Sequence, residues 1–252
     1  MTLREILTVL RGMAPEETAL AGDPVGLLIG TEDDQPVGKV GVCLDATPEA
    51  AQRAADQGVA LVVAHHPLIY HPLRRLDDSP VARAVATLVK GDIALYAMHT
   101  NWDRAPDGIN DTLASLLEIA DARPFTPDGL PRIGDLTLPR PASDFIRFVE
   151  TTLECAGTSS LRVNNVPGSR MVSRVAVCGG AGAFLAGDVL AGGADAYVTS
   201  DVRHHEFLDA AARGLPLLDA GHDATETPGM RALARLLPQQ LAGVEVLWVG
   251  GG

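Results

Sequence analysis

The stretch GKVGVCLDATPEAAQRAADQGVALVVAHH, residues 38–66, decides the fold of this chain. Apolar residues alternate over 38–46, and the apolar, β-branched run 59–64 follows, so both segments are expected to be buried strands. Between them, Thr47 suits a helix N-cap and Gly58 suits the position just after a helix. A strand, a helix and a strand over this length form a βαβ unit, which predicts a parallel sheet.

The same pattern recurs later in the chain, where a strand, a helix and another strand are expected over 174–200. At an offset of 135 residues, Cys178 matches Cys43 and Gly193 matches Gly58. We therefore predict an α/β protein of two similar halves with mixed, largely parallel sheets. Any two βαβ units look alike, so an ancient duplication and a chance likeness both stay open. Further helices are expected over 1–12, 80–91, 109–118, 143–155 and 227–237, and further strands over 93–100, 161–166, 215–222 and 244–249.

Composition excludes several classes of protein. The 252 residues include 20 Lys and Arg against 32 Asp and Glu, a formal net charge of −12, which disfavours binding to nucleic-acid phosphates. Three cysteines, Cys43, Cys155 and Cys178, make no disulfide framework and are expected to be buried core residues. No apolar run approaches the roughly 18–20 residues that a membrane span needs. Residues 1–12 have helical spacing and do not resemble a leader, so we expect a cytoplasmic protein with no membrane partner.

Histidine placement is the main chemical signal. Four of the seven histidines form two adjacent pairs, and histidine is the commonest metal ligand in proteins. His65 and His66 stand just past the carboxyl end of a buried strand, where open parallel sheets place ligands. Neighbouring residues in extended backbone point opposite ways, so the pair can serve two metals, or one metal and one substrate. The alternative is a solvated pair in a loop.

Two further motifs also follow predicted strands. In YAMHTNWD, His99 and Asp103 are four residues apart, and this mixture of imidazole and carboxylate suits zinc, manganese or iron. In DAGHDATE, His222 and Glu226 share the same spacing and can face one cavity if a helix opens there. Alternatively, Asp103 caps a turn, and the Glu226 carboxylate lies at a helix start because the helix dipole stabilises it there. Five or six ligands at strand ends exceed the need of one tetrahedral metal, which suggests two.

A fourth cluster lies in TSDVRHHEF, where Arg203, His204 and His205 follow Asp201. These residues can complete a substrate pocket or an anion site at a helix N-terminus. The alternative is a solvated helix start with Asp201 as its N-cap. The glycine-rich CGGAGA, residues 178–183, lacks the order of a dinucleotide or P-loop motif and is a weak phosphate signal.

With these motifs the chain resembles the GTP cyclohydrolase 1 type 2 family, also called the Nif-three-like dinuclear metal proteins. The matching segments span nearly the whole chain: LREIL with APEE, GDPVGLLIG, AHHPLIYH, HTNWD with GIND, YVTSDVRHHEF and DAGHDATE. Two departures are Gly22-Asp23-Pro24, where the family often has Trp-Asp-Asn, and Asp223-Ala224-Thr225, where it has an aromatic residue and Ser before Glu. Neither touches a proposed metal ligand, but both can change the pocket.

The resemblance implies two divalent metal ions per subunit, zinc, iron or manganese, held by His65, His66, Asp103, His222 and Glu226. It places His99 near the metal ions, as a catalytic residue or as a residue that supports a metal ligand. Under the same hypothesis, Arg203, His204 and His205 contact the substrate. It also implies a hexameric ring of identical chains. The domains expected are 1–125 with 217–252, bearing the metal ligands, and an inserted α/β domain over 126–216, with 123–143 as the crossing.

The implied function is a metal-dependent hydrolase that takes a small molecule such as a nucleotide. In the cyclohydrolase case, metal-activated hydroxide attacks the purine ring of GTP and formate leaves. A phosphoesterase at the same site is one alternative. A metal-binding regulatory or scaffold protein without turnover is another.

Overall fold

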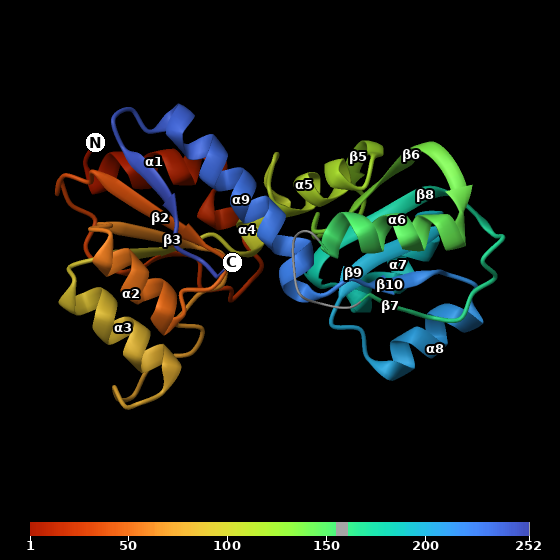
Figure 1. Ribbon diagram of the computed structural model, residues 1–252, viewed down its shortest axis with the longest axis horizontal. Helices are drawn as coiled ribbons and strands as arrows, with labels where there is room; N and C mark the ends of the chain where they lie inside the picture. Colours follow the sequence, from red (N-terminus) through yellow and green to blue (C-terminus); the bar gives the residue numbers. More distant parts are fainter. Residues whose placement is uncertain (155–160, 252) are drawn as a thin grey trace. The chain divides into compact units, whose positions relative to one another are not determined.

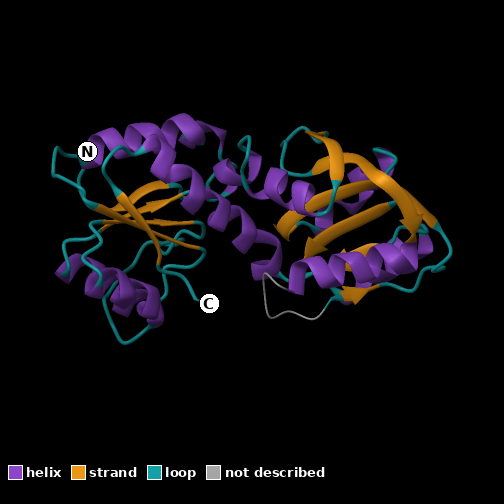
Figure 2. Ribbon diagram, turned by 45° about the horizontal axis from the view of Figure 1, so that its top comes forward, coloured by secondary structure: helices purple, strands orange, loops and turns teal. Residues whose placement is uncertain are grey.

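A computed structural model describes residues 1–154 and 161–251, and Figures 1 and 2 show its helices and strands. The chain divides into two compact units. The first unit holds Met1–Pro106 and Met230–Gly252, and the second holds Asp107–Gly229. Among the described residues, no helix combines the length and the apolar character that crossing a bilayer demands.

The first unit contains a five-stranded sheet in the order β1-β4-β3-β2-β11. Its neighbours pair in parallel except β1, which runs antiparallel to β4. Helices α2 and α3 cover one face of this sheet, and α1 covers the other (Figures 1 and 2). The elements are α1 (Leu3–Met13), η1 (Glu16–Thr18), β1 (Gly26–Ile29), β2 (Lys39–Cys43), α2 (Pro48–Asp56), β3 (Leu61–Ala64), α3 (Pro80–Lys90), β4 (Ala94–Ala97), α4 (Thr100–Arg104) and β11 (Glu245–Trp248).

The second unit contains a six-stranded sheet in the order β5-β6-β8-β9-β10-β7. Strands β8, β9 and β10 are parallel, and β5, β6 and β7 pair antiparallel. Its elements are α5 (Ile109–Leu116), β5 (Ile119–Pro124), β6 (Arg132–Pro141), α6 (Ala142–Glu154), β7 (Arg162–Val163), β8 (Met171–Ala181), η2 (Ala183–Leu185), α7 (Ala186–Ala191), β9 (Ala196–Ser200), α8 (His204–Ala212), β10 (Leu217–Asp219) and the start of α9 (His222–Gln240). The mixed α/β class predicted from the sequence is confirmed.

The two sheets repeat each other in register. The parallel pair β2–β3 and the parallel pair β8–β9 match residue for residue at the offset of 135. The corresponding pairs are Val40–Leu61 and Val42–Val63 in the first sheet, and Val175–Ala196 and Val177–Val198 in the second. The register matches the offset seen in the sequence, so the likeness extends from residue types to backbone pairing.

Local signals explain several elements. Thr47 caps α2 by accepting a hydrogen bond from the Ala50 amide at 3.1 Å, and Pro48 occupies the first turn, as predicted. Cys43 and Cys178 are buried, as expected, and burial raises the pKa of the Cys43 thiol to about 12. Cys155 lies outside the described residues.

Three expectations were wrong in detail. The segment 123–143 runs from the end of β5 through strand β6 (Arg132–Pro141) into the start of α6. The strand tolerates Pro139 because this residue falls in the register break between Asp135 and Arg140, where no ladder hydrogen bond is needed. The expected helix over 181–193 is a 3₁₀ turn followed by the short α7. The last helix begins at His222 and not near Pro228, since the Thr225 amide already donates to the Gly221 carbonyl at 3.2 Å.

The equivalent turns after α2 and α7 give a test of the repeat. Gly58 has φ +68° and Gly193 has φ +78°, and a Cβ at either position meets no atom within 4 Å. Alanine at either site should therefore lower the free energy of unfolding by about 1–2 kcal/mol, through left-handed backbone strain alone. Urea unfolding followed by circular dichroism measures this, with Gly12→Ala in α1 as a helical control that is neutral or stabilising. A loss at only one of the two turns would contradict their equivalence.

Candidate metal centre

The first unit presents a fully buried histidine at the carboxyl end of β3. His65 is 0% exposed, and its Nδ1 lies 2.8 Å from the main-chain oxygen of Met98. A carbonyl oxygen only accepts hydrogen bonds, so Nδ1 carries the proton and Nε2 keeps its lone pair. That Nε2 lies 3.5 Å from Oδ1 of Asp103, which is also buried.

Two more histidines of the first unit are held in the same way, by carboxylates. His66 Nδ1 lies 2.8 Å from Oδ1 of Asp45, in the turn after β2. His99 Nδ1 lies 2.7 Å from Oδ1 of Asp23. An ionised carboxylate also only accepts, so in both rings Nε2 is the nitrogen left to face a ligand.

Asp23 is itself fixed at the start of α4. Its Oδ2 accepts hydrogen bonds from the Thr100 amide at 3.1 Å and from the Thr100 hydroxyl at 2.5 Å. Burial works to raise the pKa of this carboxyl, but the hydrogen bonds from His99 and Thr100 outweigh it and lower the pKa below its ordinary value. Asp23 is therefore a charged, oriented acceptor for the His99 ring.

The three imidazoles of the first unit lie against one another. Their ring centroids are 5.0 Å apart for His65–His66, 5.1 Å for His65–His99 and 5.6 Å for His66–His99. One ring nitrogen of each lies within 4.8 Å of those of the other two, close enough for a shared metal ion. We call His65, His66, His99 and Asp103 the three-histidine cluster.

The second unit presents a smaller cluster at the first turn of α9. His222 Nε2 lies 3.1 Å from Oε2 of Glu226, one helical turn further on, and Glu226 is buried. On the other side of the ring, Nδ1 lies 2.6 Å from Oδ2 of Asp201, just past β9. We call His222, Glu226 and Asp201 the His222 cluster.

A glycine makes room for the His222 cluster. Gly180 has φ +64°, and a Cβ there would lie 2.2 Å from Oε1 of Glu226 and 3.3 Å from Nε2 of His222. Its amide donates to the Thr225 hydroxyl at 3.0 Å, and the Gly179 amide donates to Asn110 at 2.7 Å. The glycine-rich segment therefore permits a close approach of side chains, and its bound amides are not offered to a phosphate.

The sequence of this chain matches one protein family over almost its whole length. The family model for Duf34/NIF3 (NGG1p interacting factor 3) matches residues 1–249. The chain belongs to the Duf34/NIF3 family. A Streptomyces coelicolor protein called "GTP cyclohydrolase 1 type 2 homolog" is 39% identical over 236 residues, covering 90% of this chain and 82% of that protein.

Two solved structures share the Duf34/NIF3 fold with this chain. Staphylococcus aureus hypothetical protein SA1388 has a TM-score of 0.88 at 26% identity, covering 100% of this chain and 96% of that one. Reduced HcgD from Methanocaldococcus jannaschii has a TM-score of 0.84 at 28% identity, covering 99% and 98% of the two chains. The family resemblance inferred from the motifs is thus confirmed.

The site residues predicted for this Duf34/NIF3 chain fall into three places. His65, His66, His99 and Asp103 come together in the first unit. His222 and Glu226 come together in the second unit. The start of α8 carries the exposed side chains of Arg203, His204 and His205. The Arg203 amide there donates a hydrogen bond to the Glu206 carboxylate.

Sequence reasoning missed the oxygens that hold the rings. Asp45 offered a signal, because it follows strand β2 as the histidine pair follows β3. The alternative in which Asp201 is the N-cap of the helix is wrong: α8 begins at His204 with Arg203 as its N-cap, and the Asp201 carboxylate faces His222 instead.

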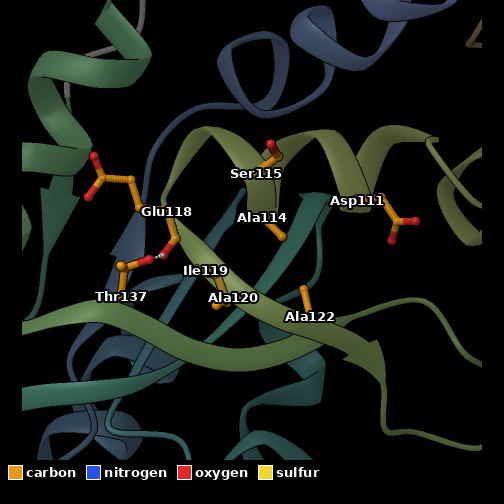
Figure 3. A pocket seen from close by; sticks show the side chains of 8 residues that line it. All are labelled: Asp111, Ala114, Ser115, Glu118, Ile119, Ala120, Ala122 and Thr137. Carbon is orange, nitrogen blue, oxygen red and sulfur yellow. Dashed lines mark hydrogen bonds between the residues drawn. The ribbon is translucent and has the colours of Figure 1, made fainter.

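A groove of about 360 Å³ opens elsewhere in the second unit, along α5 and strands β5 and β6 (Figure 3). Its rim includes the contact in which the Thr137 hydroxyl donates to the Glu118 carbonyl at 3.3 Å. None of the candidate metal ligands lines it. The lining residues are Asp111, Ala114, Ser115, Glu118, Ile119, Ala120, Ala122 and Thr137.

The ring contacts predict one tautomer for four histidines. His222 has a carboxylate near each ring nitrogen, and the shorter contact, Nδ1 to Asp201 at 2.6 Å against Nε2 to Glu226 at 3.1 Å, places its proton on Nδ1. In the metal-free protein, the neutral rings of His65, His66, His99 and His222 should carry their proton on Nδ1. Long-range ¹H–¹⁵N spectra of the imidazoles measure the tautomer. The exposed His71, His204 and His205 are the controls, and they should not share the strong preference for Nδ1–H. A dominant Nε2–H form in the four rings would contradict the assignment.

Proposed function

We propose that this protein binds two divalent metal ions and uses them to hydrolyse a small molecule. The proposed ligands are His65, His66, Asp103, His222 and Glu226. One observation carries the proposal: in each of the three proposed histidine ligands, Nδ1 is engaged by a fixed oxygen. An oxygen on Nδ1 orients the ring and raises the basicity of Nε2, which is the arrangement that metal-binding histidines use.

The chemistry of the donor set fits such a centre. Imidazole nitrogens with carboxylate oxygens suit zinc, iron or manganese. Asp103 and Glu226 are both buried, and a carboxylate that loses its hydration needs a cation or strong hydrogen bonds nearby. Five donors are more than one tetrahedral ion requires, which favours two ions. His99 belongs to the three-histidine cluster. We propose that it either takes part in catalysis or supports one of the metal ligands.

Bound divalent ions supply an acidified water and polarise a substrate oxygen. The chain itself supplies the rest of the site. Asp45, Asp23 and Asp201 keep the rings oriented, and Gly180 leaves the space in which Glu226 lies. We assign substrate contact and proton transfer to the exposed Arg203, His204 and His205, which are free to reorient toward a ligand.

The proposed substrate is GTP, with release of formate, because relatives carry the name "GTP cyclohydrolase 1 type 2 homolog". A phosphoesterase reaction at the same centre is a second candidate, since two-metal sites also serve phosphoryl transfer. A third is a metal-binding scaffold without turnover, assembled as a homohexamer.

Metal content tests the centre. His65→Ala should lower the metal bound per chain by about one ion, because it removes the fully buried ligand of the three-histidine cluster. Inductively coupled plasma mass spectrometry of protein loaded with zinc or manganese measures it. His71→Ala is the control, because His71 is exposed and its ring meets that of Tyr70 edge to face. Equal metal content in both variants would remove the basis of the proposal.

Gly180→Ala tests whether Glu226 belongs to the proposed centre. The added Cβ collides with Glu226, so metal binding should weaken by about 10-fold or more, as for other changes that displace a ligand. Gly193→Ala is the matched control, because it has the same left-handed strain with open space around the Cβ. Isothermal titration with zinc separates the two, and equal affinities would exclude Glu226 from the centre.

Formate release tests the reaction. Metal-loaded protein should release formate from GTP, and Asp103→Asn should reduce kcat by about 100-fold or more, since it removes a charged ligand. Formate is measured with a coupled dehydrogenase. Absence of formate with zinc, iron and manganese would exclude GTP, and a panel of phosphate esters then tests the second candidate.

A further inference from the structure

Asp219, the last residue of β10, is a buried carboxylate that joins three segments of the second unit. It is 4% exposed. Its Oδ2 accepts the Val202 amide at 3.0 Å, and its Oδ1 accepts the Gly221 amide at 3.2 Å. The guanidinium of Arg162, on β7, forms an ion pair with the same Oδ2. One side chain therefore ties the turn after β9 and the turn before α9 to strand β7.

These two turns carry the His222 cluster. Asp201 directly precedes Val202, and Gly221 directly precedes His222. Asp201 has φ +54° and Gly221 has φ +88°, so the backbone is left-handed beside each amide that Asp219 accepts. Asp201 pays a steric cost for this conformation, which persists only where its surroundings fix it.

Arg162 reinforces the same turn. Its Nη2 also donates to the Val202 carbonyl at 3.0 Å, so both polar main-chain atoms of Val202 are bound. The guanidinium lies 5.5 Å from the ring centre of Phe207 on α8. The ion pair balances the charge of a carboxylate that would otherwise be buried without a cation.

We propose that Asp219 is a positioning residue for the His222 ring. By fixing the peptide after Asp201 and the peptide before His222, it keeps Asp201 Oδ2 at 2.6 Å from Nδ1 and leaves Nε2 beside Glu226. Its effect on metal binding rests on the proposed function, whereas its effect on the ring does not. Residues that orient a metal-binding histidine through a second group change metal affinity by about 10- to 100-fold.

The test compares Asp219→Asn with Asp195→Ala in the full chain. Asp195 stands at the other end of β9, where its Oδ2 accepts the amides of Ser173 at 3.0 Å and Arg174 at 2.9 Å. Asp195→Ala removes the one oxygen that accepts both amides and is the harsher change to main-chain bonding. Two readouts are taken: zinc affinity by competition with a chromogenic chelator, and the Nδ1–H tautomer of His222 in the metal-free protein by ¹H–¹⁵N spectra.

We expect Asp219→Asn to weaken zinc binding about 10-fold or more and to mix the two His222 tautomers. Asp195→Ala should leave both unchanged even if it lowers stability as much. Equal behaviour of the two variants in both readouts would overturn the proposal. If Asp219→Asn does not fold, Arg162→Gln on the exposed partner replaces it, and an unchanged tautomer and affinity there would overturn the proposal too.

The two proposals fail differently. If the wild-type protein takes up no zinc, the proposed function fails, and the tautomer comparison alone decides the role of Asp219. If the wild type binds zinc and Asp219→Asn binds it equally well with an intact Nδ1–H tautomer, the metal centre stands and the positioning role fails.

Discussion

The site depends on a hydrogen bond at Nδ1 of each candidate histidine. The Met98 carbonyl and the carboxylates of Asp45, Asp23 and Asp201 each take one ring nitrogen at 2.6–2.8 Å. Each bond fixes the tautomer, the rotation of the ring and the direction of Nε2 together. Without these oxygens the histidines would be flexible side chains at strand ends, and their spacing in the sequence would carry little chemistry.

The fold supplies those oxygens through its parallel strands. Residues that follow β2 and β3 stand at the carboxyl ends of neighbouring strands of the first sheet, and Asp201 follows β9, a parallel strand of the second sheet. The carboxyl edge of an open parallel sheet is where separate segments come together. The repeat of register between the two sheets makes the comparison direct. His66 follows β3 and is a proposed ligand, whereas Asp201 stands at the equivalent place after β9 and orients a ligand. The two units thus use one backbone position for two chemical roles.

Much of this was predictable because it is local. The pattern Thr47-Pro48 to Gly58 marks a helix by its caps, and apolar runs mark the strands on either side. The candidate histidines were found because adjacent and i,i+4 spacings are visible in one segment. The oxygens were not, since Asp23 meets His99 from 76 residues away, and such pairings are set by the sheet. Likewise, the need for Gly180 comes from Glu226, which approaches it from another element.

The same reasoning explains the errors at Pro139 and Pro228. Proline marks a break in a typical helix or strand, yet β6 tolerates Pro139 at an interruption of its ladder, and α9 begins before Pro228 because Thr225 and Gly221 already close its first turn. At Pro139 the missing amide has no ladder partner to lose, whereas Pro228 is the seventh residue of α9 and removes one hydrogen bond from that helix.

The most direct test of the metal centre is a crystal structure of zinc- or manganese-loaded protein with anomalous diffraction at the metal edge. The account predicts anomalous peaks about 2.0–2.2 Å from Nε2 of His65, His66 and His222, with the Nδ1 contacts retained. Peaks confined to Nδ1 atoms or to the exposed His204 and His205, or no peak at all, would contradict it.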